Sequence, residues 1–170
     1  MRLTAPTFAT NGSSQGVVYY AIAKWTYTNP PSVPSIGCVV NVGGRDGFGI
    51  SLSKQVINLG QSLVACSQLL SCSSTLGSLS SNNAFGAGYT LQDNTSGNVH
   101  GPIDNNYTGT LILSYKRLTD GCLQAFARYA HTWSTTAITG FGVGQWAFSI
   151  SWSNPSHHWD LASAGGRTQC

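Results

Sequence analysis

Hydrophobic and polar residues alternate most regularly between residues 144 and 153. The bulky apolar residues of this stretch share one parity and are Trp146, Phe148, Ile150 and Trp152. A period of two is typical of a strand with one buried face, because successive side chains point to opposite sides of a sheet. The pattern therefore predicts a strand here, and its apolar content predicts that this strand is the central one of the core.

Further strands are predicted where β-branched and aromatic residues cluster between turn signals. These segments are residues 17–27, 36–42, 48–52, 89–91, 107–118 and 122–133. The glycines in 43–47 and in 119–121 predict two turns, and the second turn makes its flanking strands a hairpin. Three polar stretches are predicted to be two surface loops and a linker, namely residues 73–88, 93–106 and 156–166.

Residues 54–72 follow a different spacing. Their apolar side chains recur at intervals of three and four residues: Val56, Leu59, Leu63, Cys66 and Leu70. This spacing predicts an amphipathic helix with Ser53 as its N-cap. Gly60 costs about 1 kcal/mol relative to alanine inside a helix, so a pair of short strands is the alternative.

Together these elements predict an all-β fold, an antiparallel β-sandwich with at most one short helix and long surface loops. The expected architecture is immunoglobulin-like or jelly-roll-like, with about seven to nine strands. We expect one domain over residues 1–160 and a linker over 161–170 towards a further domain. Charged residues make up only 8% of the chain and Glu is absent, a composition typical of an extracellular β protein.

The formal net charge of +3 is scattered along the chain, which argues against a nucleic-acid partner. No apolar run is long enough to insert into a membrane. Five cysteines without CxxC spacing indicate disulfides formed in an oxidising compartment. The predicted pairs are Cys66–Cys72 and Cys38–Cys122, and the other two pairings of these four cysteines stay open. Cys170 is left over, which predicts a partner for it in a further module.

Candidate catalytic groups are few, and we expect no enzymatic activity. Ser62 lacks the second glycine of a nucleophile elbow. Of the five Asp residues, Asp120 is better explained by its turn, so a pair of facing carboxylates is not evident. The neighbours His157 and His158 point to opposite sides of a strand, so they are not spaced for a shared zinc ion. The sequence predicts no cofactor.

Binding is the function that the remaining polar residues favour. The expected loops around 43–47 and 93–107 contain carboxylates, amides and one aromatic ring, which together offer mixed hydrogen-bond partners and an apolar face. The candidate ligand-binding residues are Arg45, Asp46, His100, Asp104, Asn105 and Tyr107. Such a set suits a sugar or a loop of a glycoprotein.

The chain resembles the receptor-binding domains of bacterial chaperone–usher pilus tip adhesins, which are secreted β-sandwiches joined to a pilin domain. It is also similar to the tip adhesin of mannose-resistant pili of the zinc-dependent type. The similarity rests on YAIAKW at 20–25, CVVNV at 38–42, HGP at 100–102 and DNN at 104–106, in the same order. It implies that His100 is the counterpart of one zinc ligand in that family. The His-x-His pair that supplies the other two ligands there is replaced by residues 43–46, which contain no histidine, although Asp46 could offer an oxygen. A three-histidine site is therefore not present, and the resemblance implies either that zinc is lost or that His100 binds it with a changed ligand set.

We therefore expect a non-enzymatic, extracellular adhesin domain at a pilus tip that binds a host glycan or glycoprotein. Its other partners would be pilin subunits and a periplasmic chaperone, reached through a further C-terminal domain, and the isolated domain would be monomeric. One alternative is a structural or capsid-like β module, such as a phage tail or surface-layer domain, which would self-associate. A second alternative is a small secreted hydrolase.

Overall fold

The computed structural model describes residues 1–14, 16–28, 39–69, 71–74, 77–98, 101–104, 106–162 and 168–170. All regular structure in these residues is antiparallel β-sheet, and they contain no helix. The prediction of an all-β antiparallel sandwich is confirmed. Because there is no helix among the described residues, none of them forms a helical membrane span.

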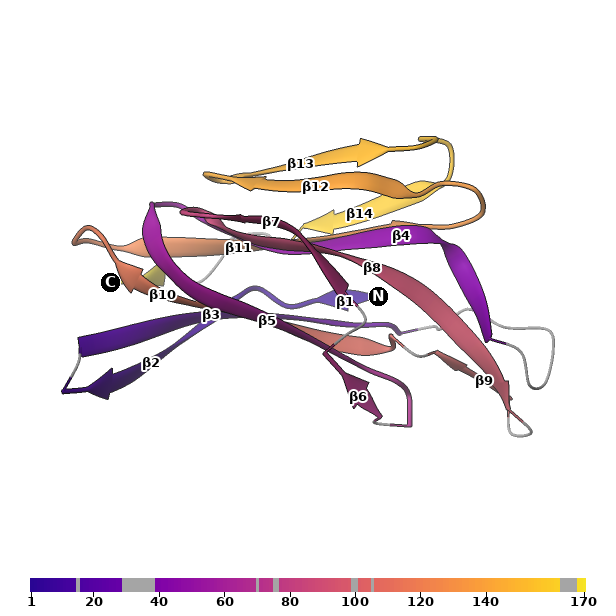
Figure 1. Ribbon diagram of the computed structural model, residues 1–170, viewed down its shortest axis with the longest axis horizontal. Coiled ribbons are helices and arrows are strands. Elements are labelled where there is room, and N and C mark those ends of the chain that lie inside the picture. The colour runs from indigo at the N-terminus through magenta and orange to yellow at the C-terminus, as the bar shows by residue number, and fades with distance from the viewer. Residues whose placement is uncertain are drawn as a thin grey trace.

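The first sheet has the strand order β1-β3-β10-β5-β6 (Figure 1). Strand β2 also pairs with β3, on the edge of β3 that faces away from β10. Its strands are β1 (Arg2–Leu3), β2 (Thr7–Ser13), β3 (Gly16–Thr26), β5 (Val56–Cys66), β6 (Cys72–Ser73) and β10 (Thr108–Arg117). On β10 every second residue is buried, including Leu111, Leu113 and Tyr115. This period of two places one face of the sheet in the core.

The second sheet has the order β14-β11-β4-β8-β7, with β15 beside β11 and β9 beside β8. Its strands are β4 (Val39–Leu52), β7 (Gly77–Asn83), β8 (Gly86–Asn98), β9 (Gly101–Asp104), β11 (Leu123–Thr132), β14 (His158–Ala162) and β15 (Thr168–Gln169). Its inner face meets the first sheet through three buried aromatic rings. The ring of Trp25 lies 4.7 Å from that of Phe48 and 5.3 Å from that of Tyr129. These contacts form the centre of the sandwich core.

A hairpin of β12 (Ile138–Gly144) and β13 (Ala147–Trp152) covers the outer face of the second sheet (Figure 1). Phe141 is its buried anchor and lies against Gly47, Gly49 and Gly88, where a Cβ atom would come within 2.2 to 2.6 Å of the Phe141 ring. Glycine therefore gives the hairpin a flat surface on which to pack.

The predicted central strand is this cover strand β13, so its assignment to the core was wrong. Phe148, Ile150 and Trp152 do share one face, as predicted, but that face is only half-buried. Trp146 lies in the hairpin turn with a φ of 58° and is 54% exposed. The alternation indicates that one face of the strand is covered, but it does not indicate which layer of the protein covers it.

The predicted helix over residues 54–72 is wrong, because residues 56–66 form strand β5. Opposite β10 its register skips Leu59, and this bulge reverses which side chains face inward. Val56 and Leu63 are both buried although they lie seven residues apart, while Leu59 is 46% exposed. A separation of seven residues is also two helical turns, so the bulge imitates the helical period.

Five turn, loop and linker predictions are also corrected. Residues 43–47 lie within the continuous strand β4, where Gly43 and Gly44 allow residues 132–137 to approach its backbone closely. The turn at 119–121 joins β10 to β11, which lie in different sheets and form no hairpin. The polar stretches 73–88 and 93–106 contain β7, β9 and most of β8, and the predicted linker over 156–166 contains β14.

Two disulfides are present among the described cysteines. The predicted Cys66–Cys72 bond is confirmed. The predicted Cys38–Cys122 bond is wrong, because Cys122 is bonded to Cys170, which therefore has its partner within this chain; Cys38 lies outside the described residues. Of the predicted linker over 161–170, the first two residues belong to β14 and Thr168–Gln169 forms β15. The two bonds indicate an extracellular or otherwise oxidising environment.

Candidate functional site

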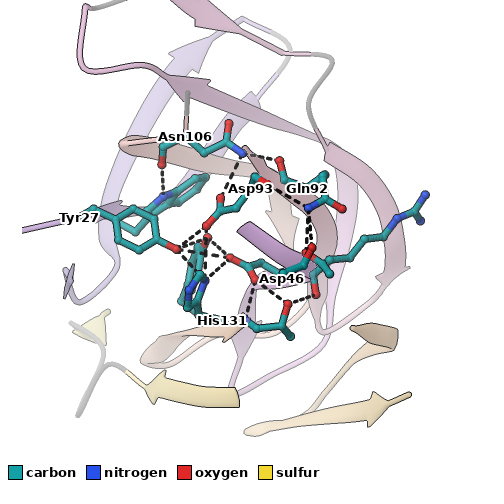
Figure 2. A network of polar contacts seen from close by, with 12 residues as sticks. Tyr27, Asp46, Gln92, Asp93, Asn106 and His131 are labelled. Carbon is teal, nitrogen blue, oxygen red and sulfur yellow. Dashed lines mark hydrogen bonds and ion pairs between the residues drawn. The ribbon is translucent and has the colours of Figure 1, made fainter. Parts of the chain in front are cut away.

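Strands from both sheets bring five polar side chains into one group, which we call the buried cluster (Figure 2). Tyr27 follows β3 of the first sheet, and the others come from β4, β8 and β11 of the second sheet. The members are Tyr27, Asp46, Asp93, Tyr129 and His131. Tyr129 and His131 are two residues apart on β11, so they point to the same side, towards the interior. The cluster therefore links the two layers of the sandwich at one end.

The imidazole of His131 lies between the two carboxyl groups. Its Nδ1 atom is 2.8 Å from Oδ2 of Asp46 and 3.4 Å from Oδ2 of Asp93. The hydroxyl of Tyr27 donates to Oδ2 of Asp93 at 2.7 Å, and that of Tyr129 donates to Oδ2 of Asp46 at 2.9 Å. Both Oδ2 atoms thus point to a common centre.

The outer oxygens of the two carboxyl groups are held by donors from neighbouring segments. The backbone N–H of Thr132 donates to Oδ1 of Asp46 at 2.8 Å. The side-chain amide of Asn106 donates to Oδ1 of Asp93 at 3.2 Å and to the carbonyl oxygen of Gln92 at 2.7 Å. These bonds fix the orientation of each carboxyl group.

Burial and hydrogen bonds shift the pKa values of the cluster residues in different directions. Asp46 is completely buried, and burial together with the nearby Asp93 charge raises its pKa from the ordinary 3.8 to about 8. Burial also acts to raise the pKa of Asp93, but hydrogen bonds with His131, Asp46 and Tyr27 outweigh it and lower that pKa. For His131, burial lowers the pKa, but hydrogen bonds with both carboxyl groups outweigh it and raise it from 6.5 to about 10.

We predict that the metal-free protein, kept in chelator, loses stability as the pH rises from 6 to 10. His131 holds its extra proton only in the folded state above pH 6.5, so its contribution is lost as the pH passes its folded pKa of about 10. Asp46 acts in the same direction between its ordinary pKa of 3.8 and its folded value of about 8. Urea denaturation at pH 6 and pH 10 measures the effect as a lower midpoint at pH 10. The isosteric Asp46→Asn variant should show a smaller difference, and an equal difference in both proteins would contradict this account.

The burial of the cluster limits its chemistry. Asp46, Asp93 and His131 expose only 0%, 3% and 8% of their surface, so a substrate cannot reach the reactive atoms in this conformation. Two shallow pockets lie elsewhere, one around Arg117 to Asp120 and one around Lys54 and Gln145. Within the described residues, the group able to hold a metal ion is Asp46, Asp93 and His131, whose ligand atoms lie within 4.8 Å of one another.

Next to the cluster, a row of rings reaches the surface, and we call it the aromatic edge. It consists of His131, Trp133, His157 and Trp159. The ring of His131 lies 5.1 Å from that of Trp159 and 6.3 Å from that of Trp133, which in turn lies 6.1 Å from His157. Trp133 is 37% exposed and His157 is exposed, while the buried His131 connects this surface to the cluster.

The predicted binding residues do not form one surface site in the described part of the chain. Asp46 is inside the buried cluster, which corrects its assignment to a surface loop. Arg45 is exposed, and Tyr107 is half-buried and packs against the core. Asp104 is in β9, but its side chain is not among those described, and His100 and Asn105 lie outside the described residues.

The candidate binding residues from the sequence do not include Tyr27, Asp93, Tyr129 or His131, although Asp93 begins the loop 93–107 that was considered for binding. A signal for two of them was present on β11. Tyr129 and His131 share the parity of Leu123 and the buried alanines between them, which marks both as core-facing positions. That Tyr129 and His131 meet Asp46 and Asp93 depends on strands far apart in the sequence, and the local pattern does not show it.

A scan against protein-family models finds no match, and a search of curated proteins finds none either. The class of protein is therefore described by its fold and its candidate site alone. The chain is a disulfide-bonded antiparallel β-sandwich with a buried carboxyl–histidine cluster and an adjacent aromatic surface.

Proposed function

We propose that this chain is a non-enzymatic adhesin domain that binds a host glycan or glycoprotein. In this proposal the domain is carried at a pilus tip, and the isolated domain is monomeric. The observation that carries the proposal is the aromatic edge, where the exposed ring of Trp133 continues a row of rings anchored in the protein interior.

An exposed, fixed indole ring suits a sugar. The face of an aromatic ring carries partial negative charge and attracts the C–H groups on the apolar face of a pyranose. The backbone of Trp133 is held in place, since it packs directly on Gly43 of β4 and its backbone N–H donates to the backbone carbonyl oxygen of His157 at 3.1 Å. A rigid ring loses little conformational entropy on binding.

Hydrogen-bonding groups next to Trp133 fit the hydroxyls of a sugar. His157 is exposed beside the ring. Arg45 is exposed on β4, and its backbone carbonyl oxygen accepts a hydrogen bond at 3.3 Å from the hydroxyl of Thr132, the residue before Trp133. An aromatic face with a few polar groups around it is the usual composition of a small-ligand site. Arg45 is thus the one surface residue of the sequence-based candidate set that this proposal retains.

We predict that Trp133→Ala weakens glycan binding by at least about tenfold, since stacked aromatic residues are frequent binding hot spots. The measurement is a glycan array with the wild-type chain, followed by affinity measurement on the best ligand. Trp146→Ala is the matched control, because Trp146 is even more exposed than Trp133 but lies in the distant β12–β13 turn. Equal affinities for wild type and Trp133→Ala would contradict the assignment of the aromatic edge, and self-association in sizing experiments would contradict an adhesin that is monomeric in isolation.

A further inference from the structure

We propose that the buried cluster is a binding site for a divalent transition-metal ion of the Zn²⁺ type, with Asp46, Asp93 and His131 as protein ligands. This site lies behind the proposed glycan surface and shares only His131 with it, and the inference does not depend on the proposed function. It rests on the positions of the ligand atoms, their donor types and the charge balance of the cluster.

The ligand atoms already lie near the corners of a tetrahedron, and an ion would lengthen the shorter separations, which are hydrogen-bond distances, by a few tenths of an ångström. Bonds of about 2.0–2.1 Å place two ligands of a tetrahedral zinc ion about 3.4 Å apart. Nδ1 of His131 lies 2.8 Å and 3.4 Å from the two Oδ2 atoms, and one ligand atom from each of the three residues lies within 4.8 Å of the other two. The hydroxyl oxygen of Tyr27 stands at a fourth corner, 2.7 Å from Asp93, 3.0 Å from His131 and 3.4 Å from Asp46.

The donor set and its supports also suit such an ion. One imidazole nitrogen and two carboxylate oxygens are ligands that Zn²⁺ accepts. Each carboxyl group is already oriented by a donor on its outer oxygen, which leaves the inner oxygen directed at the centre (Figure 2). Such outer contacts are the usual supports of ligating carboxylates. They come from Thr132 and Asn106, which are not ligands themselves.

Charge balance favours an exchange of protons for the ion. Two carboxylates and a neutral imidazole have a charge of −2, which a divalent cation neutralises. Without a metal, the same buried groups are neutral only when they hold two protons, one on His131 and one between Asp46 and Asp93. An ion can therefore replace two protons without leaving an unpaired charge in the interior, where such a charge is costly.

The test is calorimetric titration of Zn²⁺ into the whole chain after removal of metals by chelator. We expect one ion per chain and release of about two protons per ion, measured from the binding heat in buffers of different ionisation enthalpy. His131→Gln and Asp93→Asn should each weaken binding by at least about tenfold, since even the loss of a supporting contact has an effect of that size. His157→Gln is the matched control, because His157 is exposed on the aromatic edge and outside the cluster, and it should bind as wild type does.

The proposal fails if the wild-type chain binds no Zn²⁺, or if His157→Gln abolishes binding while His131→Gln retains it. The second result would place the ion on the surface. If a cluster variant does not fold, Co²⁺ added to the wild-type chain decides the question. Intense visible absorption of tetrahedral Co²⁺ supports the buried site, and the weak spectrum of an octahedral, solvent-exposed ion overturns it.

Discussion

Replacing Asp46 with alanine is expected to destabilise the protein by about 3–5 kcal/mol, because each buried donor left without an acceptor costs about 1–3 kcal/mol. Asp46 is completely buried and accepts hydrogen bonds from Tyr129, His131 and the backbone of Thr132. The substitution leaves these donors without that acceptor and opens a cavity between the two sheets. Urea denaturation at pH 6 in the presence of chelator measures the loss as a lower free energy of unfolding.

Asp120→Ala is the control for this experiment, because Asp120 is exposed in the turn between β10 and β11. Its effect should stay within about 0.5 kcal/mol. Asp46→Asn should fall between the two, since an amide keeps the shape of a protonated carboxyl group, an acceptor oxygen and a hydrogen-bond donor. A loss for Asp46→Ala no greater than that for Asp120→Ala would show that the cluster does not hold the sheets together.

Removing the Cys122–Cys170 disulfide is the second large effect, and we expect it to exceed the loss of the Cys66–Cys72 bond. The first bond closes a loop of 48 residues and the second a loop of 6. Loop-closure entropy then gives about 4 kcal/mol for the first and about 2 kcal/mol for the second. The Cys122–Cys170 bond also holds β15 against β11. In β15, the side chain of Gln169 accepts a hydrogen bond from the hydroxyl of Tyr115 on β10 at 2.7 Å.

The measurement compares two double-alanine variants, Cys122→Ala with Cys170→Ala, and Cys66→Ala with Cys72→Ala. Thermal unfolding of each, followed by circular dichroism, ranks the two losses. A larger loss from the short loop would mean that local packing around β6, and not the entropy of the unfolded chain, determines the contribution of these bonds.

The period-two pattern predicted the character of most strands but not their neighbours. Phe148, Ile150 and Trp152 share a face, as their spacing indicates, yet this face packs on the outside of the second sheet. The pattern at 56–66 was misread as helical because the bulge at Leu59 shifts the buried parity by one residue. Gly43 and Gly44 predicted a turn, but they lie within strand β4, where the absence of a side chain lets residues 132–137 pack closely against the backbone. In each case the deciding contact comes from a distant part of the chain.

The candidate site shows the same limit. Asp46 was recognised as a candidate from its loop-like surroundings, but its partners Asp93 and His131 lie 47 and 85 residues further along the sequence. Their meeting depends on which strands are adjacent, because β4 pairs with both β8 and β11. Local alternation indicates which side of a strand faces inward, and it contains no information on which strand lies beside it.

By itself, the sequence determined the class of this protein, since its alternation, low charge and cysteine usage are sufficient for a disulfide-bonded β-sandwich in an oxidising environment. Only the tertiary structure decided that Cys122 pairs with Cys170, that the most regular strand is a cover, and that two carboxyl groups and a histidine meet in the interior. The physical reason is the range of the interactions. Side-chain periodicity is set by the local backbone geometry, whereas strand order and buried contacts are set by the packing of the whole chain.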